Sequence, residues 1–305
     1  MTFKTTERKS LEYFVLDVFS DKSYKGNPLA VVFTNGNLEL VEYQNISKEF
    51  GYSETSFIYY SPEQKALDVR SFSPTGVEVG PGAGHNLLGA VCAALIKGMQ
   101  IFEEQDKSNR FVVMTDTPIP LSATFDAINQ AAVVLMHQKP AVVGQTIPPG
   151  EIAKALGLTV DDLKIDNLAP TIVKTEVAHT MVPVKNLQLL NDCIPDNKQL
   201  IEISKKYQFE GFYCFTFSEQ VHDYLVESRF FNPLIGIDED AATGTAAGPL
   251  MGFLAKNNYI KLNKEYRILQ GVKLNHPSLI ETMVRESDIL VGGTSCITMR
   301  GEIYL

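Results

Sequence analysis

Apolar residues in the first part of the chain follow strand spacing in some stretches and helical spacing in others. β-branched and aromatic residues predict strands over residues 13–18, 29–33, 56–60 and 66–72. Apolar residues at helical spacing predict a helix over residues 40–50. It stops at Gly51, because glycine tolerates the left-handed conformation that closes many helices. A glycine-rich loop, residues 80–84, precedes the apolar stretch 85–96, which predicts a buried helix ending at Gly98.

The second half of the chain, which begins near residues 131–136, repeats this alternation. The pattern predicts helices over residues 151–156 and 197–207 and strands over 172–184 and 212–216, and residues 224–231 lead to a loop over 236–240. An apolar helix then opens at Thr243-Gly-Thr-Ala-Ala-Gly248 and runs to Leu254. Pro249 has no N–H to bond back to Thr245, so this helix is expected to start late or irregularly.

Composition predicts a globular protein of two domains. At 305 residues the chain is about twice the length of a typical domain, and 45 % of its residues are hydrophobic against 21 % charged. No apolar run approaches the ~18 residues of a membrane span, and residues 1–10 lack the apolar stretch of a secretory signal, so a cytoplasmic protein without a membrane partner is expected.

Charge and cysteine usage narrow the possible partners. The formal net charge of −9, with no basic run, disfavours nucleic acid. The four cysteines lie far apart, without the spacing of metal ligands, so we expect reduced thiols and no metal site.

The two junctions between a glycine-rich loop and an apolar helix are candidate anion sites. A helix N-terminus presents unpaired N–H groups and about half a positive charge. Two such ends facing one cleft, near His85 and Gly244, would hold an anion, and Thr243 and Thr245 add hydroxyl groups. The alternative is that the glycines only let each helix pack closely.

Three side chains near these junctions could carry acid–base chemistry. Glu54 lies between a helix end and an apolar strand, where partial desolvation would raise its pKa toward useful values. His85 begins the first apolar helix, and Asp240 precedes the second. Each also has an interpretation without catalysis. Glu54 would then be a solvated glutamate, His85 a capping or core-edge histidine, and Asp240 one of three solvated acids in its loop.

An ordered set of motifs, which includes these three residues, covers nearly the whole chain. The motifs are Asp17-Val-Phe-Ser, Gly26-Asn-Pro-Leu-Ala-Val-Val32, Ser53-Glu-Thr-Ser-Phe57, Ala83-Gly-His85 and Glu239-Asp-Ala-Ala-Thr-Gly-Thr-Ala-Ala-Gly248, with Val182-Pro-Val184, Arg229-Phe-Phe231, Gln270-Gly271, Pro277-Ser278 and Val291-Gly-Gly293. In this order they resemble the PhzF-like isomerase family of phenazine biosynthesis.

The resemblance implies an α+β fold of the diaminopimelate epimerase type. In that fold two pseudo-symmetric halves each wrap a bent antiparallel sheet around a central helix, and the active site lies between them. The halves would span residues 1–125, completed by the last strand at about 294–305, and residues 126–293.

The resemblance also implies roles for individual residues. Glu54 would take and return a substrate proton, while His85 and Asp240 would orient the substrate or relay protons. The substrate would be bound by residues at the two helix starts, namely Gly84, Asn86, Thr243, Gly244, Thr245 and Ala246. Related racemases use two cysteines where this chain has Ala83 and Thr245, so a two-thiol reaction is not expected.

These inferences together predict a cofactor-independent isomerase that acts on a small carboxylate-bearing metabolite, in a homodimer. A lyase or hydratase in the same cleft and a non-catalytic metabolite-binding protein are the alternatives. The chain departs from the family pattern at Ala241, Asn86 and Asn275-His276. These departures are expected to affect the choice of substrate, so the phenazine precursor itself is not assigned.

Overall fold

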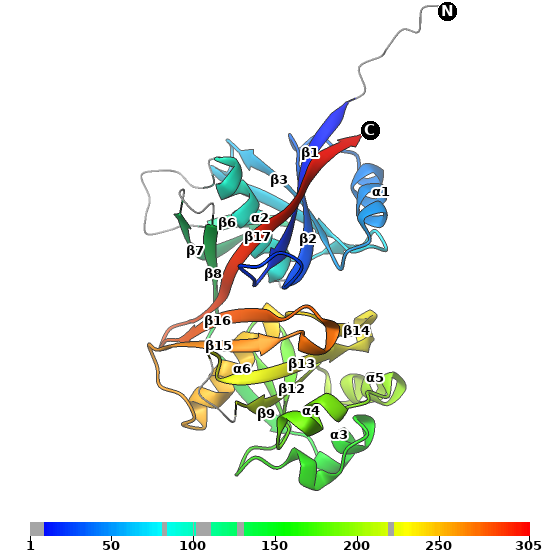
Figure 1. The fold of residues 1–305 in the computed structure, drawn as a ribbon, viewed down its shortest axis with the longest axis vertical. Helices are drawn as coiled ribbons and strands as arrows, with labels where there is room; N and C mark the ends of the chain where they lie inside the picture. Colours follow the sequence, from blue (N-terminus) through cyan, green and yellow to red (C-terminus); the bar gives the residue numbers. More distant parts are fainter. Residues whose placement is uncertain (1–8, 81–83, 100, 102–110, 127–130, 219–222) are drawn as a thin grey trace, which may run out of the picture.

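The chain folds into two lobes that lie one above the other along the long axis of the molecule (Figure 1). The computed structural model describes residues 9–80, 84–99, 101, 111–126, 131–218 and 223–305. The first lobe is formed by β1 (Ser10–Val18), β2 (Asn27–Phe33), α1 (Leu40–Phe50), β3 (Thr55–Ser61), β4 (Ala66–Phe72), β5 (Glu78–Val79), α2 (His85–Lys97), β6 (Phe111–Met114), β7 (Thr117–Asp126) and β8 (Ala131–Gln138).

The second lobe repeats this order with additional short helices. Its helices are α3 (Pro149–Ala155), α4 (Leu187–Asp192), α5 (Asn197–Tyr207) and α6 (Gly244–Lys256), with the 3-10 turns Val160–Leu163, Pro233–Ile235 and Val272–Leu274. Its strands are β9 (Val142–Thr146), β10 (Thr171–Lys174), β11 (Ala178–Pro183), β12 (Phe212–Phe217), β13 (Val226–Asn232), β14 (Ile237–Asp240), β15 (Glu265–Gln270), β16 (Ser278–Val284) and β17 (Ile289–Tyr304).

The pairing of the strands shows the internal repeat. In the first lobe β1–β2 and β3–β4 are antiparallel, while β2–β3 and β4–β6 are parallel. In the second lobe β10–β11 and β12–β13 are antiparallel, while β11–β12 and β13–β15 are parallel. The predicted α+β fold of two similar halves is therefore confirmed. The sheets differ from the expectation in being mixed, because α1 and α2, like α5 and α6, each lie in a crossover between parallel strands.

The last strand, β17, joins the two lobes. Its first part, from Ile289, pairs with β16 and β8, and from Ser295 to Tyr304 it pairs with β1 (Figure 1). The chain also crosses between the lobes after β8, since the next strand, β9, pairs with β10 within the second lobe.

The central helices are buried because they are apolar all round. In α2 the buried run extends from His85 to Ala94, and in α6 it covers Ala246 to Leu254 without interruption. Helix α2 packs on β1, β2, β3, β4, β8 and β17, and α6 packs on β9, β10, β11, β16 and β17. The N-terminus of each helix is thereby fixed at the junction of the two lobes.

Three local predictions are wrong. Residues 172–184 form the hairpin of β10 and β11, with a turn at 175–177 that contains neither glycine nor proline to signal it. The expected loop over 236–240 contains β14, which pairs with β13. Helix α6 begins directly at Gly244, since Ala246 and Ala247 both donate backbone hydrogen bonds to the carbonyl of Thr243. Pro249 is accommodated inside the helix rather than delaying its start.

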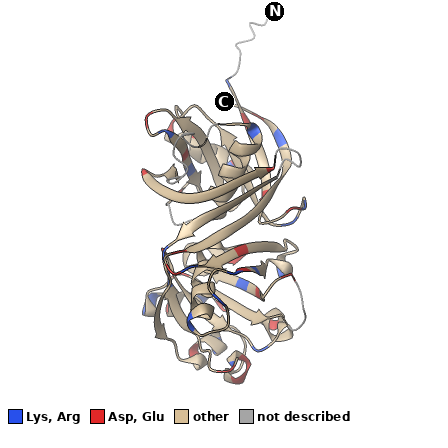
Figure 2. Ribbon diagram, turned by 90° about the vertical axis from the view of Figure 1, so that its left-hand side faces the viewer, with Lys and Arg blue, Asp and Glu red and all other residues tan. Residues whose placement is uncertain are grey.

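Charged residues are interspersed over both lobes in the view of Figure 2, with acidic and basic positions side by side. Among the described residues, none of the helices has the length and apolarity needed to cross a bilayer.

Candidate active site

A cavity of about 320 Å³ lies between the lobes, at the facing ends of α2 and α6. Its lining includes Glu54, Gly84, His85, Asp240, Thr243, Gly244 and Thr245. The structure thus brings together most of the residues that the sequence singled out. The other two, Asn86 and Ala246, are fully buried in the first turns of the helices, behind the cavity wall. Residues 81–83 of the glycine-rich loop lie outside the described part of the chain.

Glu54 occupies the short connection between α1 and β3, where the chain turns from the surface helix into the sheet. Its side chain is 14 % exposed, and burial raises its pKa to about 7. The carboxylate atom Oε2 is buried and accepts no hydrogen bond from any described residue. A hydrogen bond from the Ser53 side chain opposes part of this rise in pKa. A carboxylate with one oxygen free of donors and a pKa near neutrality is suited to accept a proton and to return it.

His85 is the first residue of α2 and is 7 % exposed. Its Nε2 atom lies 3.2 Å from Oε2 of Glu54 and 3.4 Å from Oγ of Ser53, although the contact with Glu54 lacks the angles of a hydrogen bond. Burial lowers the pKa of His85, and the negative charge of Asp240 opposes this shift. The imidazole therefore contacts the Glu54 carboxylate and interacts electrostatically with Asp240.

Asp240 ends β14, and both of its carboxylate oxygens accept hydrogen bonds. Asn27 Nδ2 donates to Oδ1 at 2.9 Å, and Thr243 Oγ1 donates to Oδ2 at 2.6 Å. Burial raises the pKa of Asp240, the charge of Glu54 raises it further, and His85 and the two donors lower it. Asn27 belongs to β2 of the first lobe, so this bond also connects the two lobes at the site.

Gln270 fixes the segment between β14 and α6. Its Nε2 donates to the Asp240 carbonyl at 2.9 Å and to Thr243 Oγ1 at 3.0 Å. Its Oε1 accepts from the Thr243 N–H at 3.1 Å and from the Tyr213 hydroxyl at 2.8 Å. Because an amide nitrogen only donates, the Thr243 hydroxyl must direct its own proton to Asp240, which favours the ionised form of that carboxyl group.

The two helix starts approach each other closely. A Cβ atom placed on Gly84 would lie 3.4 Å from Cα of Gly244 and 3.6 Å from the backbone nitrogen of Thr245. The N–H groups of Gly244 and Thr245 donate to no other described residue, whereas that of Ala246 is used within the turn. Free N–H groups and two helix dipoles converging on one cavity make it suited to an anion.

The wall of the cavity formed by the second lobe was not predicted. It consists of Val177, His179, Glu210, Phe230, Asn232, Ile235 and Ile237. Phe230 belongs to the motif segment 229–231, and the segment 182–184 is in the same strand as His179, but a motif does not show which side chains face a cavity. The positions that depart from the family pattern, Ala241, Asn275 and His276, are not in the lining, so the structure shows no direct contact for them.

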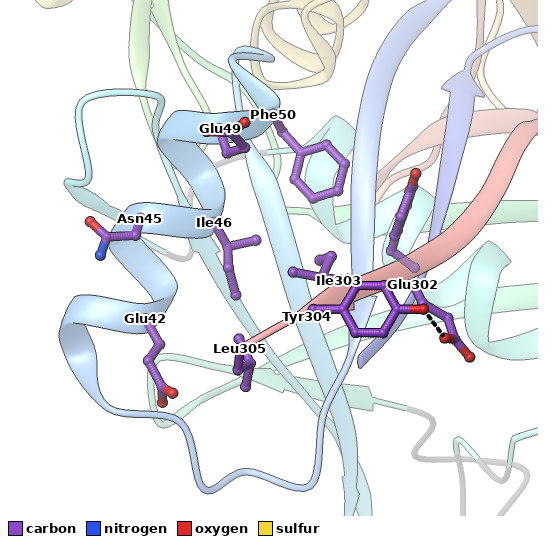
Figure 3. Close-up of a pocket in the computed structure, with 10 residues that line it drawn as sticks. Glu42, Asn45, Ile46, Glu49, Phe50, Glu302, Ile303, Tyr304 and Leu305 are labelled. Atoms are coloured by element: carbon purple, nitrogen blue, oxygen red, sulfur yellow. Dashed lines mark hydrogen bonds between the residues drawn. The ribbon is translucent and has the colours of Figure 1, made fainter. Parts of the chain in front are cut away.

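A second cavity, of about 570 Å³, lies between α1 and the ends of β1 and β17 (Figure 3). Its lining includes Ile46, Phe50, Ile303 and Tyr304, together with Glu42, Glu49 and Glu302, and none of the residues that the sequence singled out. Within the described ranges, no group of three or more His, Cys, Asp or Glu side chains is placed to hold a metal ion. The cavity between the lobes is therefore the candidate active site.

Curated relatives match nearly the full length of the chain. The chain is 28 % identical over 299 residues to trans-2,3-dihydro-3-hydroxyanthranilate isomerase of Pseudomonas aeruginosa, covering 96 % of this chain and 99 % of the relative. It is 30 % identical over 295 residues to an uncharacterized isomerase of Bacillus subtilis, covering 96 % of both chains.

Solved structures share the fold over the full length. A PhzF-family protein of Bacillus anthracis has a TM-score of 0.84 at 22 % identity, covering 97 % of this chain and all of the other. A hydroxyproline epimerase of Agrobacterium vitis has a TM-score of 0.58 at 12 % identity, with 98 % and 92 % of the two chains covered. Residues 16–301 match the sequence profile of the phenazine biosynthesis-like proteins, PhzC-PhzF, and this chain is a member of that family.

Proposed function

We propose that this protein is a cofactor-independent isomerase in which Glu54 removes a proton from carbon in a small carboxylate-bearing metabolite and returns it at another position or face. The observation that carries the proposal is the Glu54 carboxylate at the cavity. Its Oε2 atom accepts no hydrogen bond from any described residue, and its pKa is raised to about 7. The isomerase names of relatives that match along their full length support the reaction class.

The reaction begins with the ionised form of Glu54, which takes the proton from the acidic carbon next to a conjugated carboxylate. The electrons of the broken C–H bond move into the conjugated system as a negative charge. The proton on Glu54 then returns to a different carbon of that system, so atoms and charge balance without another reactant. His85, at 3.2 Å from Oε2, would orient the protonated carboxyl group between the two steps.

The negative charge of the intermediate needs stabilisation that is already in place. The free N–H groups of Gly244 and Thr245 and the start of α2 at Gly84 and His85 face the same cavity. Fixed dipoles of this kind lower the barrier because they need not reorganise as charge develops. Gln270 and Asp240 would act indirectly, by holding the turn that presents these N–H groups.

The experiment that tests the reaction class is product analysis. The protein is incubated with a panel of small amino, hydroxy and cyclic dienyl carboxylates that includes trans-2,3-dihydro-3-hydroxyanthranilate, the compound named for the P. aeruginosa relative. Mass spectrometry and NMR then identify each product. An isomer of unchanged mass supports the proposal, gain or loss of water would identify a hydratase or lyase, and tight binding without any product would identify a binding protein.

A further inference from the structure

Two almost completely buried side chains on the second-lobe wall of the cavity each have one polar atom without a partner. His179 in β11 and Asn232 at the end of β13 are each 1 % exposed, and both line the cavity. His179 Nε2 and Asn232 Oδ1 form no hydrogen bond with any described residue. An unpaired buried polar atom costs about 1–3 kcal/mol, so atoms left unpaired at a binding cavity indicate that a ligand group completes them.

The hydrogen-bonding role of His179 is fixed by its backbone neighbour. The N–H of Gly211 donates to Nδ1 of His179 at 3.2 Å, so Nδ1 carries no proton. Burial lowers the pKa of His179 to about 3, which keeps the ring neutral and places its single proton on Nε2. Nε2 is therefore a hydrogen-bond donor. The ring is also held edge-on against Phe230, with the two centroids 5.2 Å apart.

The role of Asn232 is fixed by Glu210. The Asn232 side chain interacts with the Glu210 carboxylate and lowers the pKa of that group against the larger effect of burial. Because a carboxylate accepts hydrogen bonds, the amide must turn its Nδ2 toward Glu210, which leaves Oδ1 as the free atom. Oδ1 is therefore a hydrogen-bond acceptor.

The cavity thus has a donor and an acceptor on the wall of the second lobe, whereas the helix start at Gly84 belongs to the first lobe. We infer that His179 and Asn232 form a subsite for a neutral hydroxyl group of the substrate, which accepts from Nε2 of His179 and donates to Oδ1 of Asn232. This assignment rests on the proposed function for the position of the reacting carbon. It adds that the substrate is a hydroxy-carboxylate.

Other polar groups fit the subsite less well. An ammonium group cannot accept the hydrogen bond of His179, and a second carboxylate would meet both Oδ1 of Asn232 and the charge of Glu210. An unsubstituted carbon would leave both atoms unpaired.

The experiment compares binding of four matched probes by calorimetry. The probes are cyclohexanecarboxylates that carry hydroxyl, hydrogen, ammonium or a second carboxylate at the ring carbon opposite the first carboxylate. The hydroxyl form is expected to bind wild type about tenfold more tightly than the hydrogen form, as one or two hydrogen bonds allow. Asn232→Leu and His179→Phe are expected to abolish this preference.

Thr180→Val is the matched control. Thr180 is the next residue in β11, is fully buried and also has an unpaired side-chain oxygen, but it does not line the cavity. This variant should keep the tenfold preference. His179→Phe leaves the Gly211 N–H unpaired and could unfold, so Asn232→Leu decides the result independently.

The outcomes separate the subsite from the proposed function. Glu54→Gln is expected to bind the probes with the same hydroxyl preference as wild type, so loss of isomerase activity with an intact preference contradicts neither proposal. Equal binding of the hydroxyl and hydrogen forms, tighter binding of the ammonium or dicarboxylate form, or no binding of any probe would overturn the subsite. A wild-type protein that shows the preference but yields no isomer from any substrate would contradict the proposed function alone.

Discussion

The Oε2 atom of Glu54 lies 3.2 Å from Nε2 of His85 without forming a hydrogen bond to it, so a buried carboxylate oxygen and a buried imidazole nitrogen face each other across the candidate site. A hydrogen bond from a protonated His85 would stabilise the charge of Glu54 and lower its pKa. Burial instead lowers the pKa of the imidazole and raises that of the carboxyl group. This arrangement keeps Glu54 basic enough to take a proton from carbon.

The first prediction concerns the pH dependence of the reaction. The pKa of Glu54 is raised to about 7, and proton abstraction needs the ionised carboxylate. We therefore expect kcat/KM to be constant above pH 8 and to fall about tenfold per pH unit well below pH 7. Initial rates measured across this range, on a substrate found by product analysis, test the prediction. A profile that is flat down to pH 5 would mean that a group of ordinary carboxyl pKa performs the step.

The second prediction concerns the stability of the free protein. The folded-state pKa of Glu54, about 7, lies above the ordinary value of 4.5, so its protonation contributes stability that is full below pH 4.5 and is lost as the pH rises through 7. Glu54→Gln replaces the ionisable carboxyl group with a neutral amide, so the variant does not lose this stability as the pH rises. The variant should match wild type near pH 4.5 and be more stable by roughly 3 kcal/mol at pH 8.5.

Urea unfolding at the two pH values measures this difference. Titration of His179 affects wild type and variant alike and so cancels in the comparison. A stability difference that does not change with pH would show that Glu54 is well solvated in the folded protein.

The third prediction concerns Gln270. Gln270→Leu leaves the Thr243 N–H, the Asp240 carbonyl and the Tyr213 hydroxyl without their partner, and should destabilise the protein by roughly 3 kcal/mol or more. Because the turn before α6 is then free to move, kcat should fall more than KM rises. Tyr213→Phe removes only one of these bonds and is the control, with an expected cost of about 1 kcal/mol. Equal effects of the two variants would show that Gln270 does not position the turn.

The sequence predicted the two central helices because each depends on local signals. The apolar runs after Gly84 and Thr243 identified the two central helices, and Glu54 was located between a helix end and a strand. A glycine-rich start followed by an apolar run has few alternatives to a buried helix with an open N-terminus. These local signals did not bring the residues to one cleft. That expectation came from the resemblance to the PhzF-like family.

The second-lobe wall could not be predicted in this way. His179 and Asn232 come from strands whose pairing is set by contacts between distant parts of the chain, and strand periodicity does not show which face meets the cavity. Similarly, Asn27 contacts Asp240 only because the two lobes meet. The turn in the hairpin of β10 and β11 also lacks the residues that usually mark a turn.

The most direct test of the account is proton exchange at carbon by Glu54→Gln. Wild type and variant are incubated in heavy water with a substrate found by product analysis, and the rate of deuterium incorporation at the reacting carbons is measured by mass spectrometry. The glutamine is close in size but cannot take a proton, so the exchange rate should fall by about 10²–10⁴-fold while thermal stability at pH 8.5 does not decrease. Exchange by the variant at the wild-type rate would contradict the assignment of Glu54 as the residue that transfers the proton.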